Sequence, residues 1–455
     1  MNNQLLLTNL KLFRAIDEEV IADGAIWIEG NTIRFAGPAQ DLGQVPEGVR
    51  RLDAGGQFVM PGMTESHSHL SYTNDLPTAL GTKPAQEAML HSIDNARLML
   101  GAGFTSAISF GAVHRIDVYL RNAIDAGQIP GPRLVASGRD LGGTASNADL
   151  YADHAQPQME GLGLLADGPW AVRQAVRKLK KNGGNIIKLF LDGENLSQHA
   201  PPGELTYTDE EVAAACQEAH ARNMRVATHS RSAAAVKQAV RFGADVIGHA
   251  NYLDEEALDL LKQNRHRLAV GPAIAWELQF INHCEELGFS RKSVRELGYD
   301  AEVDATVTAV KQLRDAGVKV LIGGDYGLSI TPHGSYAKDL EYFVDVFGLS
   351  PAEALLCATR DGGATADPSG MVGTLEEGKL ADLLVVNGDP IADVTVLQDH
   401  SRITAVMKDG KFYSGLTNDN PYLGLPTANG EETLTLRAQS APLQRQAEAV
   451  LESAG

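Results

Sequence analysis

The feature that most constrains the fold is a long alternation of apolar strand-like runs with amphipathic helix-like runs. Strands that are apolar on both faces belong to parallel sheets that helices cover on both sides. Alternation of this kind over roughly 300 residues predicts an α/β fold, a TIM-like (β/α)8 barrel. The strand-like runs are 105–110, 133–137, 185–191, 225–230, 245–250, 267–274 and 319–325.

Both ends of the chain differ from this pattern, because they carry short strand-like runs separated by turn residues. The C-terminal runs are too few to form a stable sheet alone, so we expect them to pair with the N-terminal ones. The sequence therefore predicts a composite β-sandwich domain from residues 1–60 plus 365–415 and a barrel domain from 61–364. A tail over 416–455 remains, and it is a candidate for contact with a second subunit in a homo-oligomer.

Charge and cysteine content narrow the class of protein. The formal net charge of −19 argues against nucleic acid and anionic membranes as partners, since basic patches supply that affinity. No secretory leader and no apolar run of about 18 residues is visible. Cys216, Cys284 and Cys357 form no CxxC pair, so neither a disulfide framework nor a thiolate zinc site is indicated. We expect a cytoplasmic protein that acts on a small molecule.

Polar side chains recur where the strand-like runs end, which is where barrel enzymes gather their catalytic groups. His67 and His69 follow the apolar run 58–63, and residues two apart in an extended segment face the same side. Lys188 lies inside an apolar run, where a bare ammonium group is costly. The candidate site consists of His67, His69, Lys188, His229, His249 and Asp325.

Each of these residues has an ordinary structural explanation when taken alone. A histidine at a strand end is more often a hydrogen-bonded core or surface residue than a ligand, and two histidines spaced as His67 and His69 are common by chance. Lys188 could extend its ammonium group to the barrel rim. Chance seldom places all six in this order at strand ends, so we interpret them as one site.

Several segments resemble a known family: MPGMTESHSHL, IIKLFLDG, THS, IGHA, GGDYG and GTLEEGKLADLLVVNGDP. On these motifs the chain resembles the amidohydrolase superfamily, close to its imidazolonepropionase-like and dipeptidase-like branch. The resemblance extends from the first strand-like runs to about residue 410. It implies a metal-dependent hydrolase on a (β/α)8 barrel.

The resemblance also implies a role for each candidate residue. His67, His69 and Asp325 would hold one divalent metal ion, and His229 and His249 would hold a second. Lys188, carboxylated by carbon dioxide to N6-carboxylysine, would bridge the two ions. A hydroxide between the metals would attack the substrate, and Asp325 would pass its proton to the leaving nitrogen. With nitrogen and oxygen ligands alone, zinc is the first expectation, and cobalt, manganese and iron are the alternatives.

The substrate is less constrained than the reaction. The dipeptidase-like relatives carry the segment GGHGD after the third strand, whereas this chain has ASGRDLGGTASN at 136–147. In this departure and in the segment HSHLSYTN, the chain resembles the hydrolases of phenylurea and thiocarbamate herbicides. We therefore expect hydrolysis of an amide, urea, carbamate or thiocarbamate bond in a small, partly apolar molecule. The candidate substrate-binding residues are Tyr72, Asn74, Tyr252, Trp276 and His333, each of which could instead be a loop or core residue.

Three alternatives remain open from the sequence. A dipeptidase or carboxypeptidase-like hydrolase of N-acyl amino acids needs a cation for the substrate carboxylate. Arg139 and Arg231 are the candidates, and a structural role is the alternative for each. A heterocycle deaminase would fit a site with one metal and no bridging lysine. A binding scaffold on an inactive barrel would require a missing ligand, and none of the six is missing.

Overall fold

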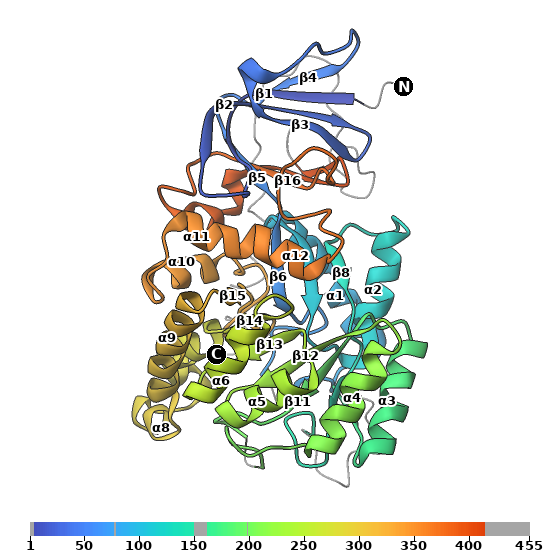
Figure 1. Cartoon of the computed structure of the whole chain (residues 1–455), viewed down its shortest axis with the longest axis vertical. Coiled ribbons are helices and arrows are strands. Elements are labelled where there is room, and N and C mark those ends of the chain that lie inside the picture. Colours follow the sequence, from blue (N-terminus) through green and yellow to red (C-terminus); the bar gives the residue numbers. More distant parts are fainter. Residues whose placement is uncertain (1–3, 77–78, 150–161, 198, 415–455) are drawn as a thin grey trace, which may run out of the picture.

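The computed structural model describes residues 4–76, 79–149, 162–197 and 199–414. Within this part of the chain the elements form a barrel with a sheet of both chain ends stacked on it (Figure 1). In that sheet the early strands β1 to β5 and the late strands β16 to β18 lie together, at the end of the molecule away from the helices that follow β11 and β12.

Eight parallel strands form the barrel, in a three-stranded and a seven-stranded sheet. Backbone hydrogen bonds join these sheets at both seams: Ser66 N donates to Ile322 O at 3.2 Å, and Asn185 N and Ile186 N donate to Ala136 O at 2.8 and 3.4 Å. The short strands β9 (Asp140–Gly142) and β10 (Gly163–Leu165) extend the seven-stranded sheet beside β11. The barrel strands are β6 (Met63–Ser68), β7 (Phe104–Ser109), β8 (Arg133–Val135), β11 (Ile186–Phe190), β12 (Arg225–Ser230), β13 (Val246–His249), β14 (Ala269–Gly271) and β15 (Lys319–Val320).

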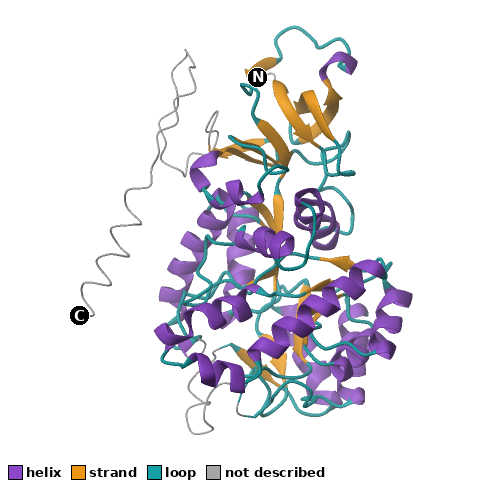
Figure 2. Ribbon diagram, turned by 90° about the vertical axis from the view of Figure 1, so that its left-hand side faces the viewer, coloured by secondary structure: helices purple, strands orange, loops and turns teal. Residues whose placement is uncertain are grey.

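Helices surround the strands of the barrel (Figure 2). Their buried apolar residues pack with those of the strands in one core cluster. The helix α4 shows how the sequence sets such a boundary, since Thr208 and Glu211 form a reciprocal capping box at its N-terminus. The helices are α1 (Ala85–Gly101), α2 (Ile116–Asp125), α3 (Pro169–Lys181), α4 (Asp209–His220), α5 (Ala233–Phe242), α6 (Glu255–Asn264), α7 (Ala275–His283), α8 (Arg291–Glu296), α9 (Tyr299–Asp315), α10 (Lys338–Asp345), α11 (Pro351–Leu356) and α12 (Gly362–Ala366).

The sheet of the chain ends has the order β18-β17-β16-β5-β1-β2-β3, and β4 pairs with β1. Its centre joins distant parts of the sequence, because β5 pairs in parallel with β1 and antiparallel with β16. A separate apolar cluster that includes Leu7, Ile26, Val385 and Met407 stabilises it. The strands are β1 (Gln4–Phe13), β2 (Val20–Glu29), β3 (Thr32–Pro38), β4 (Arg50–Asp53), β5 (Phe58–Pro61), β16 (Leu383–Val386), β17 (Ile403–Lys408) and β18 (Lys411–Ser414).

The predicted barrel is confirmed, with one local correction. The run 319–325 was expected to be a strand that ends at Asp325, but β15 stops at Val320. Gly323 has φ 151° and Asp325 has φ 61°, both outside the φ range of regular β-strands, and the chain leaves the sheet before it reaches Asp325. The β-sandwich and the domain boundaries stay predictions, and the tail 416–455 lies outside the described residues.

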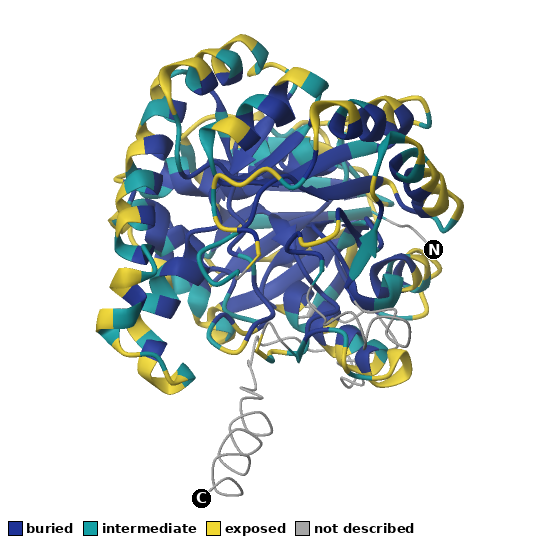
Figure 3. Ribbon diagram, turned by 90° about the horizontal axis from the view of Figure 1, so that it is seen from below, coloured by how far each residue is buried: buried dark blue, intermediate teal, exposed yellow. Residues whose placement is uncertain are grey.

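Burial follows the layers of the barrel: the strands are buried at the centre, and the exposed residues lie on the outer faces of the helices (Figure 3). Cys216, Cys284 and Cys357 are all buried with free thiols, as expected for core residues. Among the described helices, none has both the length and the apolar character that a membrane span requires.

Candidate metal centre

Two of the candidate histidines lie at the end of β6, which is buried along its whole length: His67 is in the strand, and His69 directly follows its last residue, Ser68. The His69 ring lies with Nδ1 3.1 Å from the Gly111 carbonyl oxygen, which can only accept a hydrogen bond. Nδ1 therefore carries a hydrogen, and Nε2 is left to face Asp325. A hydrogen bond of this kind fixes the ring orientation and tautomer that a metal-binding histidine needs.

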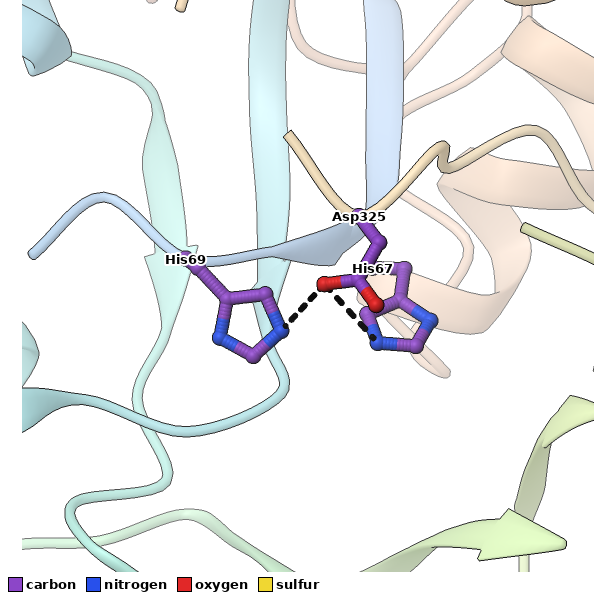
Figure 4. A group of neighbouring side chains, drawn as sticks. All are labelled: His67, His69 and Asp325. Atoms are coloured by element: carbon purple, nitrogen blue, oxygen red, sulfur yellow. Dashed lines mark ion pairs between the residues drawn. The ribbon is translucent and has the colours of Figure 1, made fainter. Parts of the chain in front are cut away.

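Asp325 reaches the same point from the loop after β15. Its Oδ1 atom lies 3.0 Å from His69 Nε2 and 3.8 Å from His67 Nε2 (Figure 4). One ligand atom from each of these three residues lies within 4.8 Å of the other two, so the three side chains could hold one ion. Although burial acts to raise it, His67 and His69 hold the pKa of Asp325 below its ordinary value.

A glycine permits this close approach of the loop to β6. A Cβ atom on Gly323 would lie 2.6 Å from the backbone nitrogen of His67, and the φ of 151° there is one that other residues rarely adopt. Gly323 N also donates to Asp339 Oδ2 at 2.8 Å, which fixes the loop. Asp325 itself has a left-handed backbone, a strained conformation that is common where a side chain has a functional position.

The remaining three candidates come from successive strands of the barrel. Lys188 is in the middle of β11, with Nζ 4.7 Å from the Phe110 ring centre and 5.0 Å from that of Phe190. His229 and His249 lie near or at the ends of β12 and β13, with ring centres 4.3 Å apart. The His249 ring is in turn 5.2 Å from the ring of His67, which joins the two groups of histidines.

The chemistry of these side chains fits divalent metal ions. Both ring nitrogens of His249 and Nδ1 of His67 are buried without a hydrogen-bond partner, although buried polar atoms are normally satisfied. Burial lowers the pKa of His67, His229 and His249 well below the ordinary value, so the rings are neutral, as metal ligands must be. Burial also lowers the pKa of Lys188, which favours the uncharged amine.

A cavity opens beside these residues, and two of the predicted substrate-binding residues line it. Tyr72 stacks on His69, with ring centres 4.2 Å apart and planes 10° apart, and Trp276 forms another part of the wall. The polar part of the lining is His67, His69, Asn147, Lys188, Glu194, His229 and Asp325. The rest is Tyr72, Leu80, Leu162, Phe190, Trp276 and Leu328.

Three predicted substrate-binding residues lie outside the described cavity lining. Asn74 Oδ1 accepts a hydrogen bond from the backbone nitrogen of His333 at 2.9 Å. The His333 ring bonds the Tyr72 carbonyl oxygen and the Tyr336 hydroxyl. Tyr252 is half-buried, and its backbone nitrogen donates to the Arg231 carbonyl oxygen at 2.9 Å. The contacts of these three residues are thus with the protein itself, and their direct role toward substrate stays a prediction.

The two arginines that could bind a substrate carboxylate have other surroundings. Arg231 is buried, and its guanidinium group lies 2.6 Å from Glu277, 3.7 Å from Glu194 and in close contact with Glu302. Although burial acts in the opposite direction, Glu302 and Glu277 hold the pKa of Arg231 above its ordinary value. Arg139 lines a different cavity and donates to the Gly163 carbonyl oxygen.

Two carboxylates at the site were missed by the sequence reasoning. Glu194 lines the cavity in the loop after β11, and burial raises its pKa while Arg231 opposes that change. Asp140 is buried, and both its oxygens lack a hydrogen-bond partner. Burial raises the Asp140 pKa to about 7, against the opposing effects of Lys188 and His69. The one sequence signal was position, since Glu194 and Asp140 each follow shortly after a strand-like run.

Comparison with known proteins bears on this site. A family model described as "Amidohydrolase family" matches residues 58–413. An ochratoxinase of Aspergillus niger is 28% identical over 424 residues, which cover 88% of this chain and 84% of the relative. An imidazolonepropionase of Rhizobium rhizogenes is 21% identical over 418 residues, which cover 83% of this chain and 90% of the relative.

Solved structures with the same fold include a prolidase in complex with N-methylphosphonate-L-proline. It has a TM-score of 0.79 and 26% identity, over 90% of this chain and all of the other. Two further structures are similar in fold alone. Molinate hydrolase has a TM-score of 0.73 and 17% identity, over 96% of this chain and 99% of the other. Phenylurea hydrolase B has a TM-score of 0.70 and 21% identity, over 90% of this chain and 96% of the other.

Proposed function

Because this chain belongs to the amidohydrolase family, we propose that it is a metal-dependent hydrolase of a C–N bond. Its substrate would be a small, partly apolar amide, urea or carbamate, or a thiocarbamate. The observation that carries this proposal is the convergence of His67, His69 and Asp325 on one point at the mouth of the barrel. The ochratoxinase relatives support hydrolysis, and the segment HSHLSYTN, which resembles that of phenylurea and thiocarbamate hydrolases, favours ureas and thiocarbamates as first substrates.

Two divalent ions are the proposed cofactors, with zinc as the first expectation for nitrogen and oxygen ligands. His67, His69 and Asp325 would hold one ion, and His229 and His249 the other. Lys188, as N6-carboxylysine, would serve both, because an anion between two cations suits this buried position better than a bare ammonium group. When bound, the ions would act as Lewis acids and lower the pKa of a water molecule.

The protein's own groups then direct the reaction. Asp325 is held by His69 at 3.0 Å and stays ionised, so its Oδ atoms can take a proton from the attacking water. The same carboxylate would return that proton to the leaving nitrogen. Tyr72, fixed by its stacking on His69, and Trp276 would hold the apolar part of the substrate in the cavity.

A dipeptidase-like activity is the second candidate, because a prolidase complex is among the solved structures with this fold. Such a substrate carries a carboxylate, which requires a cation to bind it. Arg231 is already in contact with Glu277, Glu302 and Glu194, and Arg139 lines another cavity. These contacts favour substrates without a carboxylate.

Metal analysis paired with a substrate screen tests the proposal. We expect plasma emission to find about two divalent metal ions per chain, zinc first, and we expect turnover of phenylureas or carbamates. Two ions with turnover of dipeptides alone would favour the second candidate. One ion with release of ammonia from a heterocycle would favour deamination and remove the bridging role of Lys188. Metal-loaded protein without any hydrolysis would contradict the proposed function.

A further inference from the structure

The Glu194 carboxylate is a polar part of the cavity wall to which the proposed reaction assigns no task. We propose that Glu194 binds a cationic nitrogen of the substrate, so that the enzyme selects molecules with a positive charge beside their apolar part. This inference rests on the proposed function, because it names the substrate class of the same site.

The charges around Glu194 are unbalanced. One guanidinium group, that of Arg231, faces the three carboxylates of Glu194, Glu277 and Glu302, and Lys188 acts on Glu194 only from beyond salt-bridge distance. Within the described part of the chain, no other cationic side chain lies within 4.0 Å of Glu277 or Glu302. Burial raises the pKa of Glu277 and of Glu194, and Arg231 opposes that change in both. A further cation would stabilise this group of side chains.

Glu194 is the member of the group that a ligand can reach. Its side chain keeps 30% of its surface exposed, whereas Arg231, Glu277 and Glu302 keep 2% or less. It also lies farther from the guanidinium group, at 3.7 Å, than Glu277 does at 2.6 Å. The cluster therefore has two buried carboxylates committed to Arg231 and a third at the cavity surface.

The rest of the cavity wall suits an organic cation. Trp276 and Tyr72 supply aromatic side chains, which attract a cation placed over the ring face. Leu80, Leu162 and Leu328 supply apolar surface for the uncharged part of the molecule. Among the described residues of this lining, Lys188 is the one lysine and none is an arginine, so the cavity wall offers no guanidinium group to a negatively charged part of a substrate.

Two ureas of nearly equal shape make the kinetic test. Para-(dimethylaminomethyl)phenylurea is cationic at neutral pH, and para-isobutylphenylurea has a CH group in place of the amine nitrogen. We expect kcat/KM to favour the cationic urea by about tenfold or more, the worth of one charge-assisted contact. In Glu194→Gln, the cationic urea should lose this advantage, while kcat/KM for the neutral urea changes less than about threefold.

Two controls accompany the variant. Glu47→Gln removes the same charge from an exposed residue in the turn before β4 and should leave the ratio unchanged. Metal content is measured on every protein, because a fall in Glu194→Gln would assign Glu194 to the metal centre and overturn the proposal. An unchanged preference in Glu194→Gln, or no preference in the wild type, would overturn it as well.

Binding measurements separate this inference from the proposed function. Calorimetry with benzylamine and benzyl alcohol needs no turnover. We expect benzylamine to bind about tenfold more tightly to the wild type and equally to Glu194→Gln. If neither urea is hydrolysed but the benzylamine preference depends on Glu194, the proposed reaction fails and the cation site stands. If ureas are hydrolysed and the two probes bind alike, the cation site fails alone.

Discussion

His333 donates a hydrogen bond from Nε2 to the Tyr72 carbonyl oxygen, 3.1 Å away, although the two residues are 261 positions apart in the chain. Burial lowers the His333 pKa to about 4, so the ring is neutral and its Nδ1 accepts from the Tyr336 hydroxyl at 2.8 Å. Because the Tyr72 ring stacks on His69, His333 connects the last long loop of the barrel to a metal-ligand candidate through Tyr72.

Replacing His333 tests this connection. We expect His333→Ala to lower kcat/KM about tenfold, because Tyr72 loses the contact that fixes its backbone beside His69. Tyr336→Phe removes one hydroxyl from the same chain of contacts and should cost less. Kinetics and metal content measured together decide the point, and wild-type kcat/KM in His333→Ala would show that Tyr72 needs no such support.

Loss of the Lys188 side chain should lower metal content and activity together. We expect Lys188→Ala to bind fewer metal ions and to lose roughly 100-fold in kcat, since the anion proposed to serve both ions is gone. Plasma emission and steady-state kinetics provide the measurements, with the exposed Lys178→Ala as the matched control. Full metal occupancy and normal turnover in Lys188→Ala would remove the carboxylated lysine from the mechanism.

Asp325→Asn should affect the reaction far more than the fold. An amide cannot accept the proton of the attacking water, so we expect kcat to fall roughly 1000-fold. The circular dichroism spectrum should stay that of the wild type, because the loop is also fixed by the bond from Gly323 to Asp339. The exposed Asp304→Asn is the control. An unchanged rate would rule out Asp325 as the proton carrier.

Arg231→Met should be strongly destabilising. It leaves the buried Glu277 and Glu302 without their cation, a change that costs about 3–5 kcal/mol when a buried ion pair is broken. The lower denaturant midpoint should recover in large part when Glu277→Gln and Glu302→Gln are added. If Arg231→Met alone unfolds at the wild-type midpoint, the group of buried charges does not stabilise the fold.

His220 provides a pH dependence away from the metal centre. A hydrogen bond to Asp245, 3.1 Å away, raises the pKa of His220, while burial opposes it. The pair therefore stabilises the fold fully below the unfolded-state pKa of about 6.5 and loses that contribution as the pH rises through the folded-state pKa. Because both side chains are partly exposed, the effect should not exceed about 0.5 kcal/mol.

Unfolding of wild type and His220→Gln at pH 5.5 and pH 8.5 measures the His220 contribution. The variant should be less stable than the wild type at the lower pH and nearly equal to it at the higher. A difference that is constant with pH, or that grows toward pH 8.5, would show that His220 is not the titrating group.

The sequence was sufficient for those parts of the structure that local patterns encode. The alternation of strands and helices predicted the barrel, and the spacing of His67 and His69 placed both rings near one point. Lys188, His229 and His249 were expected on strands of the barrel, and they lie there because each belongs to an apolar run of the right length. These are properties of single segments.

Local sequence patterns do not predict contacts between distant segments. Asn74 and His333 were expected in the cavity lining, yet they bond each other and the Tyr72 loop across a separation that no local spacing reveals. For Arg231 the sequence left a substrate-binding and a structural role open, because it does not show that Glu277 from α7 and Glu302 from α9 meet it in the core. Glu194 was missed for the same reason.

The sheet of the chain ends can be completed only late in the synthesis of this protein. The partner of β5 on one side is β16, which is synthesised only after the whole barrel sequence. Until Leu383 has left the ribosome, the hydrogen-bonding edge of β5 has no neighbour there, and such an edge invites pairing with other chains. A chain cut short before β16 would keep that edge permanently open, so the same pairing that completes the native fold marks truncated copies as prone to aggregate.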